Sequence, residues 1–436
     1  MRINMQFVNR ITLFTCLSAA ACISVGASSN AGAVPSTALP NSRRQAEVRS
    51  RAQSYRADFD QILQLVRDRF HDSKLNGVDW NAIGAAYRAK LAEVKSKSEF
   101  QVLINRMIGE LHASHAGYFT DDDVDYYMMP AVMRQDMTGH RTEHIGVMGS
   151  QEGGEFLVAG VLEGGPADKA GILSGDRLVM ADGAPFRSAG SFRGKESRPV
   201  EVQYKRANEQ SLRSVAITPV RQNILRAFLD ATESSARVLI VGGKRIGYIH
   251  LWTMANDSFR QALENLVVRR LHDTDGLILD LRDGFGGMPW NYADVFFRPD
   301  VTWEQKSRGS GLITRNSGYN KPVVALINHG TRSAKEFFSY ELKITRRATL
   351  VGTKTAGAFL GAGTFDVGSD GLLELPVLGL KLDGKLLEGN GITPDIVVAP
   401  KLTYTDGDTQ LLAGQRALLD AITSGGRPAP PGRISL

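Results

Sequence analysis

Two short stretches of the sequence contain residue types that together could carry out acyl transfer. In "LHASHAGYF", residues 111–119, His115 follows Ser114 and precedes a turn of small residues. In "NHGTRSAKEFF", residues 328–338, Ser333 follows a short loop. A serine nucleophile needs a base within reach, and such pairs are recognised by geometry rather than by spacing. A plainer alternative stays open for each residue, His115 as a polar loop residue and Ser333 as a helix N-cap.

Two further stretches contain groups that could assist such a reaction. "DLRDGFGGM", residues 280–288, turns through three glycines, which let backbone N–H groups approach a ligand closely. The N–H of Ala334, beside Ser333, could bind an oxyanion. Glu388 stands before a glycine-rich turn in "LLEGNGITPD", where a carboxylate taken alone is a surface group. No zinc-type Cys/His spacing and no phosphate-binding loop is present, so no metal or cofactor is predicted.

The elements before His115 are predicted to be helices. In "FDQILQLVRDRF", residues 59–70, apolar side chains recur at helical spacing. Asp79 stands where the N-cap of a second helix is expected. A third amphipathic stretch, residues 98–111, leads directly into the His115 loop. We therefore predict an N-terminal helical domain over residues 43–125, which presents His115 from a helix end.

The remaining chain has two patterns. Residues 140–222 contain short strands and glycine-rich turns with one short helix beginning at Pro166, and they predict a small β-rich domain. Residues 237–425 alternate strands and helices, and "GLILDLR" and "PVVALIN" are apolar on both faces, as in covered parallel sheets. Ligands of such sheets bind beyond the carboxyl ends of the strands, where the loops of Gly286 and Ser333 begin. The fold class is therefore multidomain α/β.

The N-terminus has the pattern of a secretory signal peptide. Arg2 and Arg10 precede an apolar run over residues 11–27, and "AGA" at residues 31–33 is a candidate cleavage site. We predict a signal peptide over residues 1–33 and export to the periplasm, the cell envelope or the medium. The apolar run would be removed, so the mature chain is expected to lack a transmembrane span.

Both cysteines, Cys16 and Cys22, lie within this segment. The mature chain is therefore expected to have neither disulfides nor a thiol nucleophile. Lipid attachment at Cys22 is disfavoured, because Ala19 stands where a branched aliphatic residue would be wanted.

Length and composition indicate an ordinary globular protein. The 436 residues favour two or three domains, and 42% hydrophobic and 22% charged residues are typical values. The net charge is +6, but the basic residues are scattered. The densest group, residues 41–56, is interleaved with apolar residues at helical spacing and predicts a solvated helix face, so nucleic acid is not a predicted partner.

Several motifs resemble a known family when they are taken in order. "GPADKAGILSGDRLVMADG", residues 165–183, is similar to the core of a PDZ domain. After it, "DLRDGFGGM", "NHGTRSAKE", "VGTKTAGA" and "EGNGITPDI" resemble the carboxy-terminal processing, or tail-specific, serine peptidases of the S41 type. The resemblance implies a PDZ-like domain after the helical domain, then a ClpP/crotonase-like α/β catalytic domain. It also implies polypeptide substrates and no cofactor.

The sequence departs from that family at one catalytic position. The processing peptidases use a Ser/Lys dyad, and their lysine follows the segment that matches Thr355–Gly357. Ala358 stands there in this chain, and Lys354 lies on the other side of the turn.

The tricorn-like branch of the same family lacks that lysine, and this sequence resembles it at two places. One is Ser114-His115-Ala116, and the other is Glu388 before "GITPD". The resemblance implies Ser333 as nucleophile, His115 as base, and Glu388 orienting the base through Ser114. It implies an oxyanion hole formed by the N–H groups of Gly286 and Ala334. The branch has an acidic residue where this chain has Ala334, so no substrate preference is carried over. A histidine base predicts that kcat/KM rises through a pKa near 6.5, roughly that of a free imidazole.

The PDZ-like segment "HIGVM", residues 144–148, is implied to bind a peptide C-terminus by strand addition. The residues implied to bind it are Ile145, Gly146 and Val147. Two alternatives remain for the whole chain, a non-hydrolytic binder of peptides or apolar ligands on the same fold, and a Ser333/Lys354 dyad peptidase. A homo-oligomer is also left open.

Overall fold

The computed structural model describes residues 41–206, 209, 211–288, 290–309, 311–400 and 407–425, with side chains from residue 53 onward. The predicted signal peptide and both cysteines lie outside these residues. The chain divides into two units, residues 1–48 and 49–436, and the following concerns the second. No helix in the described ranges combines the length and the apolar composition that crossing a membrane requires.

Three helices open the described chain, as predicted. They are α1 (Asn41–Arg69), α2 (Trp80–Lys90) and α3 (Lys97–Gly109), with short 3-10 turns at Leu75–Gly77 and Leu91–Glu93. The predicted apolar face of α1 is buried, and its members are Phe59, Ile62, Leu63, Val66 and Phe70. Asp79 caps α2 as predicted, because its carboxylate accepts the N–H groups of Asn81 and Ala82.

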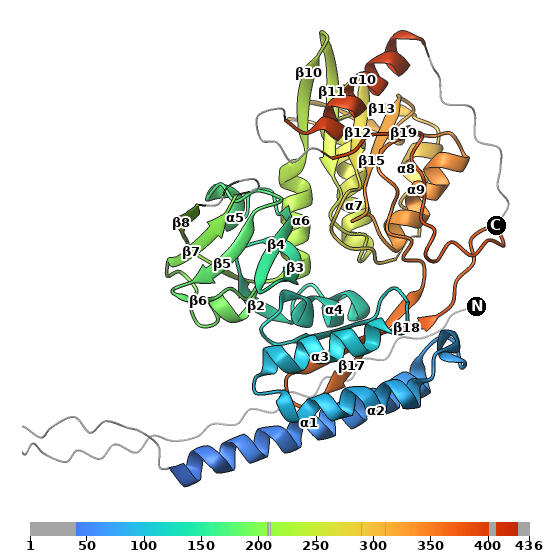
Figure 1. Ribbon diagram of the computed structural model, residues 1–436. Coiled ribbons are helices and arrows are strands. Elements are labelled where there is room, and N and C mark those ends of the chain that lie inside the picture. Colours follow the sequence, from blue (N-terminus) through green and yellow to red (C-terminus); the bar gives the residue numbers. More distant parts are fainter. Residues whose placement is uncertain are drawn as a thin grey trace, which may run out of the picture. The chain divides into compact units, whose positions relative to one another are not determined.

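A three-stranded antiparallel sheet packs on these helices, and the sequence did not predict it. Its strands, in spatial order, are β1 (Gly117–Thr120), β18 (Gly371–Leu378) and β17 (Gly361–Val367). Figure 1 shows β17 and β18 in orange beside the blue helices, and Leu373 and Leu375 share a buried cluster with Phe59. The sheet therefore joins the region just after His115 to a segment far along the chain. An unpredicted helix, α4 (Val124–Arg134), follows β1.

The β-rich domain has the predicted character. Its sheet runs in the order β3 (Val147–Glu152), β4 (Glu155–Val161), β5 (Arg177–Ala181), β7 (Val200–Lys205) and β8 (Leu212–Ile217), with β6 (Ala184–Pro185) paired to β5. The short helix α5 (Pro166–Lys169) has proline at its start, as predicted, and a 3-10 turn lies at Gly190–Phe192. A two-stranded pair, β2 (Arg141–His144) with β9 (Val220–Asn223), connects this domain to its neighbours in the chain.

The C-terminal part is an α/β domain, as predicted. Its sheet runs β10 (Arg237–Val241), β11 (Lys244–His250), β12 (Gly276–Asp280), β15 (Val323–Ile327), β16 (Thr349–Gly352) and β19 (Ile396–Val397). All neighbours are parallel except β10 and β11. Every residue of β12 and β15 is buried, which confirms that both faces of this sheet are covered.

Alternate residues of the central strands face two separate cores. Leu277 and Leu279 belong to the cluster that includes side chains of α6 (Ile224–Ser235), α7 (Asp257–Asn265) and α9 (Ala334–Ile344). Ile278 instead belongs to the cluster that contains Leu418 of α10 (Thr409–Thr423). The carboxyl ends of the strands are therefore held between two helical layers. Further short elements are a π-helical turn, Leu266–Arg270, and α8 (Asp294–Phe297).

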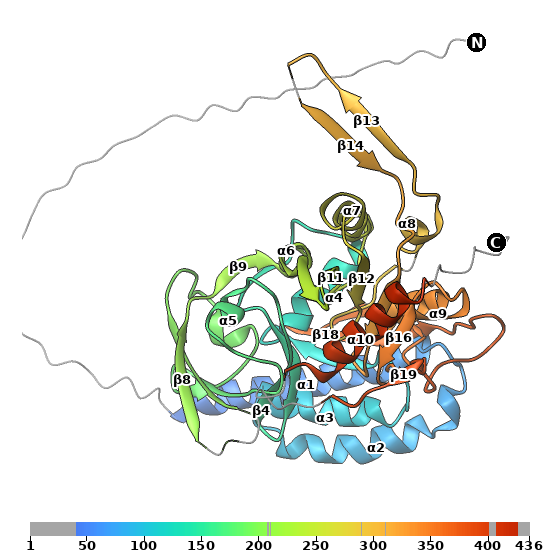
Figure 2. The same cartoon turned by 90° about the horizontal axis from the view of Figure 1, so that it is seen from above.

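An exposed ribbon interrupts this domain. β13 (Thr302–Lys306) and β14 (Leu312–Asn316) pair only with each other among the described strands. Figure 2 shows the ribbon extending away from α8. Every residue of β13 is exposed, and the ribbon contributes no residue to the cavity described below.

Candidate active site

Ser333 lies at a strand-to-helix turn of the α/β domain. β15 ends at Ile327 and α9 begins at Ala334, so Ser333 is the residue before the first helical turn, as predicted. Its backbone has φ 54° and ψ −129°, which a residue with a Cβ adopts only under constraint. The N–H of Ser333 donates to the carbonyl of Ala358 at 3.1 Å and to Oε2 of Glu336 at 3.1 Å. These bonds hold the strained turn, and strain of this kind concentrates at functional sites.

Glu336 is the anchor of this turn, and the sequence analysis missed it. Its carboxylate also accepts the Thr355 hydroxyl at 2.5 Å and the N–H groups of Gly357 and Ala358, both at 2.8 Å. Burial raises the pKa of Glu336, and these hydrogen bonds oppose the rise. A signal was present in the sequence, because Ser-x-x-Glu at a helix start is the pattern of a capping box.

Gly286 lies directly against Ser333. A Cβ added at Gly286 would lie 2.4 Å from the Cβ of Ser333 and 2.8 Å from the nitrogen of Ala334, so only glycine fits. Among the described residues, no acceptor is found for the N–H of Gly286 or of Ala334. The two donors predicted for an oxyanion hole are therefore adjacent to the serine and free to bind an oxygen.

His115 is held by Ser114 and, less directly, by Glu388. The Ser114 hydroxyl lies 2.9 Å from Nδ1 of His115. One Glu388 oxygen accepts the backbone N–H of Ser114 at 2.9 Å, and the other accepts the N–H of Phe359 at 2.7 Å. The predicted contact from Glu388 through the Ser114 side chain is thus corrected. Both carboxylate oxygens are occupied by backbone donors, and the hydroxyl turns to the imidazole instead.

The environment makes His115 a weaker base than a free imidazole. Burial and, to a smaller extent, the positive charge of Arg332 lower the pKa of His115, the negative charge of Glu388 opposes them, and the resulting pKa is about 4. The expected pKa near that of free imidazole is therefore too high. In the neutral tautomer whose Nδ1–H donates to the Ser114 Oγ, Nε2 is the nitrogen that can accept a proton.

One cavity brings four of the predicted catalytic residues together, without Ser114 and Glu388, and no hydrogen bond between Ser333 and His115 is found among the described residues. It has a volume of about 440 Å³ and is lined by Ser333, His115, Gly286 and Ala334. Most of its remaining wall is apolar, and the apolar side chains are Met129, Val132, Met133, Phe285, Met288, Trp290, Phe337, Leu360, Leu378 and Leu380. Two charged side chains, Arg332 and Glu374, also line it. Burial raises the pKa of Glu374 to about 7, so this carboxyl is a poor counter-ion for Arg332.

Lys354, the base of the alternative dyad, lies outside the cavity that contains Ser333. It is exposed, and it is not among the residues that line the cavity. Ala358, at the position of the family's lysine, is buried, and its carbonyl accepts the N–H of Ser333. At the position where the family has its lysine base, this chain therefore has a backbone carbonyl that holds Ser333 in place.

The predicted peptide-binding residues lie at a sheet edge but are not open. β3, which begins at Val147, ends the strand order of its sheet on one side, so that edge is unpaired among the described strands. Residues 144–148 are all buried, and the carbonyls of Ile145 and Gly146 accept the N–H groups of Ala167 and Leu162. A peptide could reach this loop only if neighbouring segments moved.

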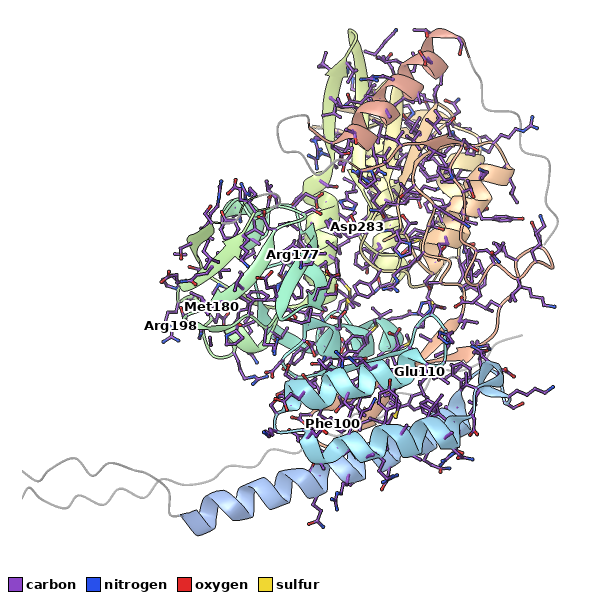
Figure 3. The ribbon with its side chains drawn as sticks, in the orientation of Figure 1. Phe100, Glu110, Arg177, Met180, Arg198 and Asp283 are labelled. Atoms are coloured by element: carbon purple, nitrogen blue, oxygen red, sulfur yellow. The ribbon has the colours of Figure 1, made fainter. Side chains whose placement is uncertain are left out.

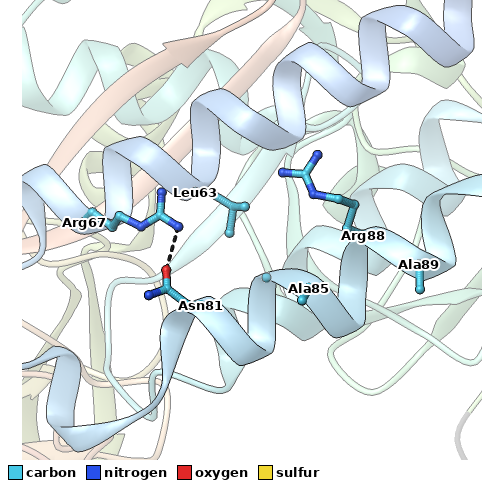
Figure 4. A pocket seen from close by; sticks show the side chains of 7 residues that line it. Leu63, Arg67, Asn81, Ala85, Arg88 and Ala89 are labelled. Carbon is cyan, nitrogen blue, oxygen red and sulfur yellow. Dashed lines mark hydrogen bonds between the residues drawn. The ribbon is translucent and has the colours of Figure 1, made fainter.

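A second groove on the surface lacks reactive side chains. A groove of about 460 Å³ lies between α1 and α2, and Figure 4 shows its wall, with Arg67 bonded to Asn81 at 2.8 Å. It contains no nucleophile and no base. In the part of the chain that the structure describes, no group of three or more His, Cys, Asp or Glu side chains could hold a metal ion.

Comparisons with known proteins agree with this architecture. Residues 245–398 match Peptidase family S41, residues 51–109 match the Tricorn protease C1 domain, and residues 143–217 match the PDZ domain. A putative tricorn protease homolog 2 of Streptomyces coelicolor is 25% identical over 405 residues, which cover 87% of this chain and 34% of that protein. A carboxyl-terminal-processing protease of Synechocystis is 23% identical over 380 residues, 84% of this chain and 86% of that protein.

The crystal structure of the tricorn protease has a similar fold. Its TM-score is 0.51 at 18% sequence identity, over 85% of this chain and 37% of that chain. This chain thus spans about a third of the length of the tricorn relatives that it matches. The α/β domain of this chain therefore matches Peptidase family S41 over residues 245–398, after a helical region that matches the Tricorn protease C1 domain and a segment that matches the PDZ domain.

Proposed function

We propose that this chain is an exported serine endopeptidase that cleaves polypeptides by acyl transfer through Ser333. The observation that carries the proposal is a single cavity lined by a strained serine, a neutral histidine and two residues with free backbone N–H groups. The S41 match and the curated relatives named as proteases support it.

In the proposed mechanism, the Ser333 hydroxyl attacks the scissile carbonyl carbon while its proton passes to Nε2 of His115. The N–H groups of Gly286 and Ala334 bind the oxyanion of the tetrahedral intermediate. When the intermediate collapses, the leaving amine takes the proton from His115, and an acyl-Ser333 ester remains. A water molecule then attacks the ester with His115 again as base, which regenerates the serine and releases the acid.

Ser114 and Glu388 serve His115 in this scheme without touching the substrate. The Ser114 hydroxyl fixes the ring through Nδ1, and Glu388 fixes the Ser114 backbone. The negative charge of Glu388 also raises the pKa of His115, so it favours the imidazolium that forms during attack. The two residues would therefore act on kcat rather than on substrate affinity.

Export and the substrate class belong to the same proposal. The signal-like pattern over residues 1–33 supports export, which N-terminal sequencing of the mature protein from the periplasm would test. The PDZ match supports polypeptide substrates bound through their C-termini. Removal of the substrate's free C-terminal carboxylate should then weaken cleavage of long polypeptides.

One observation favours a second candidate function, a non-hydrolytic binder. The cavity wall is mostly apolar, and a histidine with a pKa near 4 is a weak base. A fluorophosphonate probe separates the two functions, because only an activated serine reacts quickly. The proposal expects labelling of the wild type, none of Ser333→Ala, and cleavage of a peptide library read by mass spectrometry. If neither labelling nor cleavage occurs and a peptide or apolar ligand binds in the cavity, the second function is supported.

A further inference from the structure

A fully buried lysine lies directly behind the proposed nucleophile. Lys335, in the first turn of α9, has 0% exposure. Burial of an ammonium is unfavourable, and a positive charge at a helix N-terminus is opposed by the helix dipole. Burial lowers the pKa of Lys335 to about 7. The buried Lys335 therefore lowers the stability of the fold, and a functional role would explain its presence.

The Lys335 ammonium binds the loop that contains Gly286. Its Nζ donates to the carbonyls of Asp283 at 2.7 Å, Arg282 at 3.2 Å and Trp252 at 3.4 Å. Arg282 and Asp283 lie on the glycine-rich loop that follows β12, on which Figure 3 labels Asp283. An ammonium has three donors and no acceptor, so these carbonyls use its whole capacity.

The same carbonyls hold the loop against the segment after β11. The Trp252 carbonyl, besides the bond to Lys335, accepts the N–H of Phe285 at 2.9 Å. The Gly286 carbonyl accepts the N–H of Met254 at 2.9 Å and the Thr253 hydroxyl at 2.8 Å. The Phe285 N–H and the Gly286 carbonyl, which flank the Phe285–Gly286 peptide, are thus both held by this segment, and this restricts how the Gly286 N–H can point. Lys335 shares the Trp252 carbonyl with these contacts and holds the loop just before Phe285, at Arg282 and Asp283.

Acidic groups from two segments offset the buried charge. Asp283, Asp280 and Glu163 each raise the pKa of Lys335. Glu163 comes from the PDZ-like domain, and its carboxylate binds the Trp252 indole N–H at 2.5 Å and Nδ1 of His250 at 2.9 Å. The charged groups around Lys335 therefore belong to the same loop and to the segment that supports it.

We propose that Lys335 is a positioning residue for acyl transfer, because its ammonium fixes the loop after β12 so that the Gly286 N–H faces the oxyanion. The inference rests on the proposed function. It does not make Lys335 a base, since Nζ points to three carbonyls and no bond to Ser333 is found among the described residues.

The test compares Lys335→Met with Lys343→Met in the full chain. Lys343 is a lysine of the same helix whose Nζ bonds to the Thr393 carbonyl and to Asp395, away from the loop. Lys335→Met should lower kcat by about 10²-fold, as loss of one oxyanion donor does, with KM changed less than about threefold. A peptide aldehyde, which forms a tetrahedral adduct with serine, should bind weaker by about the same factor as kcat falls. Lys343→Met should change neither value.

A second readout does not depend on catalysis. Amide hydrogen exchange of ¹⁵N-labelled protein should be faster at Phe285 and Met288, whose N–H groups donate to the carbonyls of Trp252 and Met254, in Lys335→Met, and unchanged in Lys343→Met. If Lys335→Met unfolds, Lys335→Arg, which keeps the charge but changes the donor geometry, takes its place with a smaller loss of kcat and faster exchange at the same two amides.

The outcomes separate this inference from the proposed function. An active wild type with equal kcat, aldehyde affinity and amide exchange at Phe285 and Met288 in the two methionine variants would overturn the role of Lys335 and leave the peptidase intact. An inactive, unlabelled wild type would overturn the peptidase. The exchange rates alone would then decide whether Lys335 fixes the loop, and unchanged exchange would overturn that as well.

Discussion

The proposed active site has a serine half, Ser333 with Gly286, and a histidine half, His115 with Ser114 and Glu388. The residues of the two halves are brought together by different kinds of contact. Ser333 and Gly286 follow neighbouring parallel strands, and the pairing of Leu279 with Ala325 brings both loops to one edge of the sheet. The histidine half instead needs contacts across the chain, because Ser114 and Glu388 are 274 residues apart. The nucleophile can therefore be formed within the α/β domain, whereas the base is in place only after β1 has paired with β18.

The two halves also differ in how their charges are compensated. Near Ser333, the Glu336 carboxylate accepts four hydrogen bonds, which keep a buried group satisfied. His115 is partly buried near the positive charge of Arg332, and Glu388 compensates only in part. In the serine half, hydrogen bonds to Glu336 thus stabilise the backbone, whereas in the histidine half neighbouring charges set the pKa of His115. Substitutions in the two halves should have different signatures.

The largest effect should come from removing the reactive group of either half. Ser333→Ala and His115→Ala should each lower kcat by at least about 10⁴-fold, because nucleophile and base act as a unit. The double variant should be no worse than either single variant. His112, exposed and only three residues before His115, is the matched control, and His112→Ala should keep wild-type kcat. A larger loss of kcat in His112→Ala than in His115→Ala would show that His115 is not the base.

A smaller loss should follow from weakening the support of His115. Glu388→Gln should lower kcat by roughly 10²-fold, less than the ~10⁴ reported when an orienting carboxylate contacts the imidazole directly. KM should stay near the wild-type value, while the melting temperature should fall slightly, because the amide NH2 would face one of the two backbone N–H groups that the carboxylate accepts. Loss of the charge lowers the stability of the imidazolium, while the amide oxygen can still accept the Ser114 N–H.

Ser114→Ala tests how the two supports are connected. The alanine variant keeps the backbone N–H that Glu388 accepts and loses only the hydroxyl bonded to Nδ1 of His115. The two losses in kcat should therefore multiply to a large extent in the double variant. A double variant no worse than the larger single would instead indicate a chain of contacts through the hydroxyl, against the observed geometry.

The sequence predicts the serine half better than the histidine half for a physical reason. Ser333, Ala334 and Gly286 lie in strand-loop-helix patterns that a short window contains in full. His115 and Glu388 were only candidates in the sequence, and their roles were assigned by resemblance, because pairing between β1 and β18 leaves no local periodicity. The low pKa of His115 was likewise hidden, since burial and the charge of Arg332 arise only in the fold. The role of Lys335 was missed because a lysine in the first turn of a helix is ordinarily expected to face solvent.

The pH dependence of kcat/KM should report the environment of the histidine half. The base must be neutral, so activity rises with pH through the pKa of His115, which burial lowers to about 4. Arg332→Met removes a positive charge that lowers this pKa, so the acidic limb should move to higher pH. Arg346→Met, on an exposed residue beyond the end of α9, is the control and should not move it. A wild-type limb near pH 6.5, unmoved by Arg332→Met, would contradict the burial of a neutral base.

The smallest effect is expected at Lys354, and it decides which half supplies the base. If the α/β domain provided both nucleophile and base, Lys354 would have to approach Ser333 and lose its solvation to act at neutral pH. The side chain is exposed and outside the cavity, while the nearby turn is held by the bond from Ser333 to the carbonyl of Ala358. Lys354→Ala should therefore leave kcat/KM within about twofold of wild type, as surface substitutions away from a site do, and should leave the acidic limb in place. A large loss of kcat, with loss of the histidine-dependent limb, would place the base in the same half as Ser333 and reduce the long-range sheet to a structural element.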